Sequence, residues 1–185
     1  VTDFRRAVQA TADESIVFRT IGAYEMVNCA SADYVAARGK PRRIAELADH
    51  VLVDYAPTFG QRSTGFEYQA GGREVSVPMR TALTVSSVDS YVGACLAGLG
   101  IVQIPSISAS PHLASGRLVE LLPRHRPAPM PVSIVLPNRR HLPERVRVFV
   151  SWLEGIVRPR LIRIPARSRQ ESAPTRTVDR ATARR

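Results

Sequence analysis

Cysteine and long apolar runs are both scarce in this chain of 185 residues. Its two cysteines, Cys29 and Cys95, lie far apart, outside any Cys-x-x-Cys pair and away from histidine, which excludes the common zinc and redox motifs. We expect two buried thiols, and a single disulfide between the two cysteines remains an alternative. No apolar run approaches the roughly 20 residues that span a bilayer, and the N-terminal charges precede no apolar secretory segment. These absences predict a cytoplasmic protein with no membrane partner.

Lysine is almost missing, since Lys40 is the one lysine among 26 basic residues, and the formal net charge is +10. Most of that charge lies in residues 158–185, where nine arginines face only Glu171 and Asp179. This segment is also rich in Pro, Ser, Thr and Ala, a composition that buries too little apolar surface to fold. The sequence therefore predicts a disordered, Arg-rich tail over 158–185. It is either a solvated extension or a weak binder of the DNA backbone.

Recognisable catalytic motifs are absent. The sequence has no Gly-x-Ser-x-Gly elbow, no phosphate-binding glycine loop with lysine and no His-Glu-x-x-His pair. Gly98-Leu99-Gly100 follows a helical pattern and precedes a strand, which is the reverse of a dinucleotide-binding turn. The four histidines are scattered through expected helix ends and loops. We expect no enzyme, no catalytic residue, no bound metal and no cofactor.

What the chain does contain is an alternation of strand and helix patterns, typical of an α/β fold with a parallel or mixed sheet. Residues 58–72 are polar and glycine-containing, which leaves a loop or a hairpin around Gly71-Gly72. Expected strands cover 16–21, 24–30, 51–53, 75–78, 81–85, 101–104 and 131–136, and expected helices cover 32–38, 41–50, 86–97 and 143–156.

Two of these helices carry further expectations. After the third, Gly98 is suited to the left-handed conformation that ends a helix, and Gly100 to a tight turn into the strand. In the last helix Pro143 sits in the first turn, and Trp152 flanks the apolar stripe, where we expect it to cover the core. The stripe consists of Val146, Phe149, Val150, Leu153 and Ile156.

Seven segments in order resemble the C-terminal effector-binding domain of LysR-type transcriptional regulators, and the resemblance runs from about Asp3 to Ile156. The strongest is the helix, Gly-Leu-Gly and strand unit at 89–105, and the others lie at 16–22, 30–35, 39–41, 46–50, 113–119 and 131–140. Ala7 and Gln9 depart from the family pattern, in which Arg and Gly are common.

The resemblance implies an α/β, periplasmic-binding-protein-like (type II) fold of two lobes. Residues 1–23 and 131–157 would form a first lobe that is incomplete, and 24–130 a complete second lobe. A small-molecule effector, most simply an organic anion, would bind between the lobes of a homo-oligomer. The family's winged helix-turn-helix, which binds DNA, has no counterpart in this chain.

The expected effector site centres on Ser86-Ser87-Val88-Asp89, a Ser-x-x-Asp sequence before an apolar run. This pattern suits a helix N-terminus, capped by Ser86, whose unpaired N–H groups attract an anion. The resemblance places Ser86, Ser87 and Val88 at the cleft, and a second region at Thr58 and Phe59. Two alternatives stay open, namely a solute-binding protein for transport and a gene fragment that does not fold stably.

Overall fold

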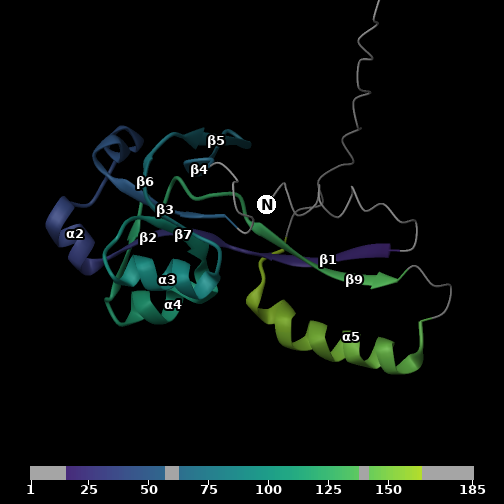
Figure 1. The fold of residues 1–185 in the computed structure, drawn as a ribbon. Coiled ribbons are helices and arrows are strands. Elements are labelled where there is room, and N and C mark those ends of the chain that lie inside the picture. Colours follow the sequence, from purple (N-terminus) through teal and green to yellow (C-terminus); the bar gives the residue numbers. More distant parts are fainter. Residues whose placement is uncertain (1–15, 57–62, 138–141, 164–185) are drawn as a thin grey trace, which may run out of the picture.

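A computed structural model describes residues 16–56, 63–137 and 142–163 of the chain (Figure 1). Strand β1 (Ile16–Tyr24) pairs antiparallel with β9 (Met130–Pro137), and the helix α5 (Glu144–Val157) lies along this pair. All other long elements gather at one end of the two strands. The mixed sheet and covering helices confirm the expected α/β class.

The larger sheet is built around β2 (Met26–Ser31), which runs antiparallel to β7 (Val102–Pro105) on one side and β8 (Leu118–Leu121) on the other. β3 (Val51–Tyr55) pairs in parallel with β6 (Arg80–Val85). A parallel bridge between Leu52 and Ile101 joins this second pair to β7. The strands therefore follow one another in the order β6-β3-β7-β2-β8.

The sequence predicted either a loop or a hairpin for residues 58–72. The structure has a hairpin, and its first strand lies in this range. β4 (Phe66–Ala70) and β5 (Arg73–Val77) pair antiparallel around the Gly71-Gly72 turn. The side chain of Gln103 in β7 ties this hairpin to the sheet, because its amide bonds both the N–H (2.9 Å) and the carbonyl (2.7 Å) of Glu67. The hairpin is thus fixed across the strand ends rather than free in solvent.

Some of the helices match the predictions from the sequence and others do not. α2 (Ala32–Arg38) is as predicted, and Ser31 caps it by accepting the Tyr34 N–H at 3.1 Å. The helix expected over 41–50 is instead a 3-10 helix, η1 (Ile44–Asp49), so its start and type were wrong. α4 (Ser106–Ala114) was not predicted, because Pro105 and Pro111 read as breaks in a helical pattern. No helix among these residues is long and apolar enough to cross a bilayer.

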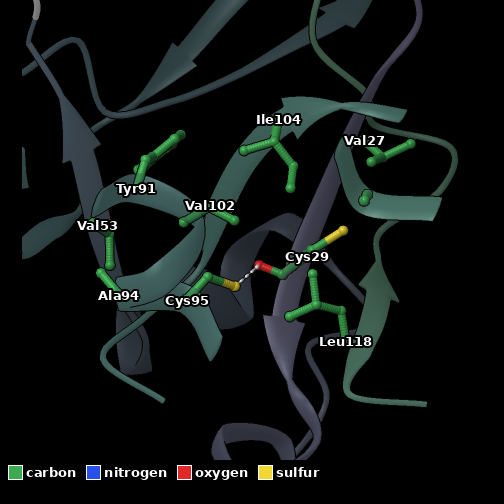
Figure 2. Close-up of a cluster of buried hydrophobic side chains, with 10 residues drawn as sticks. Val27, Cys29, Val53, Tyr91, Ala94, Cys95, Val102, Ile104 and Leu118 are labelled. Carbon is green, nitrogen blue, oxygen red and sulfur yellow. Dashed lines mark hydrogen bonds between the residues drawn. The ribbon is translucent and has the colours of Figure 1, made fainter. Parts of the chain in front are cut away.

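The core between β2, β7 and α3 (Val88–Leu96) contains both cysteines (Figure 2). Cys95 donates a long, weak bond from Sγ to the carbonyl of Cys29 at 3.8 Å, and both thiols are free and fully buried. Burial raises the pKa of each thiol to about 12, so both stay protonated at neutral pH. The expectation of two buried thiols is confirmed.

The turn between α3 and β7 confirms the prediction for Gly98 and shows a further reason for glycine at position 100. Gly98 has φ +77°, the left-handed conformation expected at a helix end. Gly100 does not adopt a positive φ. Glycine is required there because a β-carbon would lie 2.9 Å from the carbonyl oxygen of Val51 in the neighbouring strand.

Helix α5 departs most from expectation. Val150 is buried and Leu153 half-buried against the strand pair, but Phe149 and Trp152 are 57% and 59% exposed. The prediction that Trp152 covers the core is therefore wrong. A second correction concerns the tail, since η2 (Arg158–Arg160) and the bridge between Ile162 and Ala23 belong to the fold. Residues 158–163 are therefore not part of a disordered tail, and 164–185 lie outside the described residues.

His50 forms a buried pair with Tyr34 beneath α2. The Tyr34 hydroxyl accepts the Val51 N–H at 3.1 Å and shares a second hydrogen bond of 3.1 Å with His50 Nδ1. Burial lowers the pKa of His50 from its ordinary value near 6.5, because the charged ring is poorly solvated there. His50 thus packs as a neutral ring hydrogen-bonded through Nδ1 to the Tyr34 hydroxyl.

We expect the free energy of unfolding to fall as the pH is lowered below about 6.5, because the unfolded chain then binds a proton that the folded His50 resists. Urea unfolding at about pH 7.5 and about pH 5.5 measures this slope. His50→Leu should flatten it, whereas His112→Gln, in the last turn of α4, should leave it unchanged. Equal slopes in His50→Leu and the unmutated chain would contradict the assignment.

Candidate effector-binding site

The carboxyl ends of two parallel strands meet at the start of α3. Tyr55 in β3 is paired with Val85 in β6, and the N–H of Ala56 donates to the Val85 carbonyl at 2.9 Å. The chain leaves β6 and enters α3 within three residues. Parallel strand ends beside a helix N-terminus are the usual ligand-binding edge of an α/β sheet. The structure thus brings the predicted segment 86–88 to such an edge.

The cap of α3 is Ser87 and not Ser86, which corrects the prediction. Ser87 Oγ accepts the Ser90 N–H at 3.1 Å and donates to the Ser90 hydroxyl at 2.8 Å. Ser86 lies one residue outside the helix and is exposed. Among the described residues its hydroxyl has no hydrogen-bond partner. Ser86 thus presents an exposed hydroxyl one residue before the cap.

The surface around this helix start includes one residue that sequence reasoning missed. Tyr55 is 41% exposed and its ring lies 5.6 Å from that of Tyr91, the buried aromatic residue of α3. The Tyr91 hydroxyl accepts the Gln103 N–H at 3.0 Å, and burial raises the pKa of that hydroxyl, so it remains neutral. Val88 is 52% exposed. In the sequence, the only feature that could have indicated Tyr55 as a site residue is its position at the end of a strand.

The electrostatics of the helix start are mixed. Unpaired N–H groups and the helix dipole give it partial positive character. Asp89, exposed in the first turn, adds a carboxylate that stabilises the helix but opposes a bound anion. Ser86, Ser87 and Val88 come together here, while Thr58 and Phe59 lie in 57–62, outside the described residues.

Alternative chemistry finds little support in the described part of the chain. Within residues 16–56, 63–137 and 142–163, no three His, Cys, Asp or Glu side chains gather as metal ligands. His50 is hydrogen-bonded to Tyr34, and both cysteine thiols are buried. A hollow of about 550 Å³ lies over α5, away from the start of α3, and is lined by Glu144, Arg145, Val148, Phe149 and Trp152.

The change of cap can be tested by two neighbouring substitutions. Ser87→Ala removes a hydroxyl that satisfies the Ser90 N–H, and we expect it to lower the free energy of unfolding by about 1 kcal/mol. Ser86→Ala should change it by less than about 0.5 kcal/mol, as an exposed residue outside the helix. Chemical denaturation of both variants measures the difference, and the reverse order would return the cap to Ser86.

The strand order and the covering helices define a mixed α/β domain of the periplasmic-binding-protein-like class. The LysR substrate binding domain model matches residues 4–156, most of the chain, so the protein belongs to the LysR family. A curated relative, the uncharacterized HTH-type transcriptional regulator YhjC of Escherichia coli, is 39% identical over 149 residues. That match covers 80% of this chain and 50% of the relative, so the chain spans about half of that protein.

Solved structures give the same family. The regulatory domain of AphB from Vibrio vulnificus is 27% identical with a TM-score of 0.61, covering 77% of this chain and 69% of that domain. The CrgA regulatory domain from Neisseria meningitidis, a LysR-type transcriptional regulator, is 25% identical with a TM-score of 0.64, covering 78% and 70%. The family's place in transcription regulation is thus supported from sequence and from structure.

Proposed function

We propose that this chain is the effector-sensing part of a LysR-type transcriptional regulator. It would bind a small organic anion between a first lobe of residues 1–23 and 131–157 and a second lobe of 24–130. The contacts would come from Ser86, Ser87 and Val88, with Thr58 and Phe59 from the neighbouring loop. The observation that carries the proposal is the exposed start of α3 at the ends of β3 and β6.

The connection between the two parts supports a mechanism of ligand-biased closure. β1 leads into β2 through Glu25, and the chain returns from β8 to β9 through Arg126. Arg126 donates to Glu120 from Nε at 2.9 Å and from the terminal nitrogen Nη2 at 2.6 Å, and it also bonds Glu25. Both crossings are therefore tied together at one guanidinium. An effector that binds one arrangement of the lobes better than another would shift their equilibrium.

Control of DNA-dependent transcription would then pass through a helix-turn-helix, as the names of the curated relatives indicate for those proteins, and through a homo-oligomer. The curated relatives are transcriptional regulators, which favours this reading over solute capture for transport. Such work on DNA would take place in the cytoplasm. Residues 158–185 would add at most a weak, salt-dependent contact with the phosphate backbone.

The test is a thermal melt of the chain with a panel of small organic acids, each matched by its neutral amide. We expect a cooperative transition that one acid raises and its amide does not, because a ligand that binds only the folded state stabilises it. Asp89→Asn should strengthen that shift by removing the opposing carboxylate, and Ser86→Ala should weaken it without altering the unliganded melt. A broad transition insensitive to every acid would overturn the proposal and favour a non-functional fragment.

A further inference from the structure

Strand β1 has a second pairing partner just before it enters the larger sheet. Ala23, the residue before the last of β1, is paired with Pro131 of β9 on one edge. On its other edge the Ala23 N–H donates to the Ile162 carbonyl at 3.1 Å, and the Ile162 N–H donates to the Ala23 carbonyl at 2.9 Å. Figure 1 shows the chain returning from the end of α5 to this point. β1 is therefore the middle strand of a short three-stranded ribbon.

Residues 158–163, which we call the strap, are anchored on α5. Arg158 forms an ion pair with Glu154 at 3.2 Å, and the Leu161 N–H donates to the Arg158 carbonyl at 3.1 Å. The same Glu154 carboxylate pairs with Arg19 of β1 at 3.1 Å. One mostly buried carboxylate thus holds both the base of the strap and the strand that the strap covers.

Strand β1 has room for the strap only because of a glycine. A β-carbon at Gly22 would lie 2.8 Å from Leu161 Cβ and 3.1 Å from the Ile162 carbonyl oxygen. The pairing of β1 with β9 also shifts by one residue between Thr20 and Gly22. Such an irregularity bends a strand and increases its local twist. The strap therefore packs closely against β1 at the place where that strand is most easily deformed.

The tip of the strap lies beside the two connections between the strand pair and the larger sheet. Glu25 is the single residue between β1 and β2, and Arg126, which bonds Glu25, lies on the return path from β8 to β9. Ile162 borders a hollow of about 230 Å³ together with residues of both connections, among them Glu25, Met26, Arg126, Pro127 and Pro129. A turn of one part against the other would change the shape of this hollow.

We propose that the strap is a conformational device that limits how far the strand pair, with α5, turns relative to the larger sheet. Ribbons of two strands twist more than broader sheets and are less stable, so a third strand stiffens the connection. With the strap bound, bending is confined to Glu25 and Arg126. With the strap released, the irregular stretch at Thr20 and Gly22 becomes a second bending point. Release breaks few contacts, which is typical of elements that move.

The strap lies beyond residue 156, where the match to the LysR model ends. Its consequence for sensing rests on the two-lobe arrangement of the proposed function, since a bound strap would favour one lobe arrangement over others. The strap itself requires no effector. A chain whose strap controls the lobes but that ignores every acid would defeat only the proposed function. A chain that responds to an acid but moves no differently without its strap would defeat only the present proposal.

The first experiment is hydrogen exchange of the full chain, followed by NMR. Ile162→Pro removes the N–H that donates to Ala23, whereas Ile162→Ala keeps it and is the matched control. We expect the Ala23 amide to exchange at least about tenfold faster in Ile162→Pro than in Ile162→Ala. The Ile101 amide, which donates to Val51 within the larger sheet at 2.9 Å, should keep its rate in both variants. Equal Ala23 rates would overturn the proposal.

A distance measurement then tests the stiffness itself. Nitroxide labels on Ser115→Cys, at the end of α4, and on Ser151→Cys, in α5, report the separation of the larger sheet from the strand pair. Both serines are exposed, while Cys29 and Cys95 are fully buried, so the labels attach to the introduced thiols. We expect the distance distribution from double electron–electron resonance to be narrow in Ile162→Ala and clearly broader in Ile162→Pro.

Gly22→Ala releases the strap by a second route, because its β-carbon displaces Leu161 and leaves the Ile162 N–H in place. It should speed Ala23 exchange and broaden the distribution as Ile162→Pro does. A distribution of unchanged width in both release variants would overturn the proposal, even with faster Ala23 exchange. Failure of both variants to fold would overturn it as well, because the strap would then be part of the core rather than a detachable device.

Discussion

Replacing Asn28 by leucine is expected to lower the free energy of unfolding by about 3 kcal/mol, because its amide is completely buried and used at both ends. The nitrogen Nδ2 donates to the carbonyls of Leu121, Leu122 and His125 at 3.3, 3.4 and 2.9 Å. The oxygen Oδ1 accepts from Gln103 Nε2 at 2.7 Å. Leucine has similar size but leaves these polar groups without their partner.

Asn28 also secures a strained stretch of backbone. Leu122 has φ +43°, the only positive φ at a non-glycine residue in the described chain, and its carbonyl is one of the three that Asn28 binds. Such a conformation costs of order 1 kcal/mol or more and persists only where neighbouring contacts enforce it. Loss of the amide therefore releases the turn that leads from β8 toward β9, as well as the bonds themselves.

Urea unfolding of Asn28→Leu, Gln103→Leu and the double variant measures both the loss and its coupling. Because the two side chains are bonded to each other, the double variant should lose less than the sum of the single losses. Asn28→Asp provides a sharper contrast, since a carboxylate facing three carbonyls is repelled. That variant should be less stable than Asn28→Leu at neutral pH and recover as acid protonates it. Additive losses, or a stable Asn28→Asp at neutral pH, would contradict this account.

Gly100→Ala is the second change expected to be large, at about 2 kcal/mol of lost stability. The added β-carbon would lie 2.9 Å from the Val51 carbonyl oxygen and 3.1 Å from the Val53 nitrogen, both backbone atoms. Next to Gly100, Ile101 exchanges bonds of 2.9 Å with Val51 and Val53, which join β3 to β7. The clash therefore falls on the link between the two halves of the large sheet.

Gly93→Ala is the matched control, with an effect of opposite sign. Gly93 lies within α3, and a β-carbon there meets no atom within 4 Å. Alanine has a higher helix propensity and a smaller loss of chain entropy, so we expect stabilisation of up to about 1 kcal/mol. Denaturant midpoints of the two variants should move in opposite directions. A similar shift in both would mean that crowding at Gly100 is not the cause.

The candidate site shows which functional residues local sequence patterns can predict and which they cannot. The helix start at Ser86, Ser87 and Val88 was predicted from a serine, an acidic residue and an apolar run, and the family resemblance gave these residues their predicted role at the cleft. The same pattern misplaced the cap by one residue, because Ser86 and Ser87 both fit it and only the backbone path out of β6 selects Ser87. Tyr55 could not be found this way. It reaches the site through the pairing of β3 with β6, which joins residues distant in sequence.

The sequence by itself determined the α/β class, most of the order of strands and helices and the LysR family, because these depend on periodicity, turn residues and motifs along the chain. Tertiary structure alone decided which apolar residues are covered. Val150 and Trp152 both suited the core side of α5 by composition, yet one is 8% and the other 59% exposed. Helical spacing specifies which side chains share a face, whereas burial depends on whether another element packs against that face.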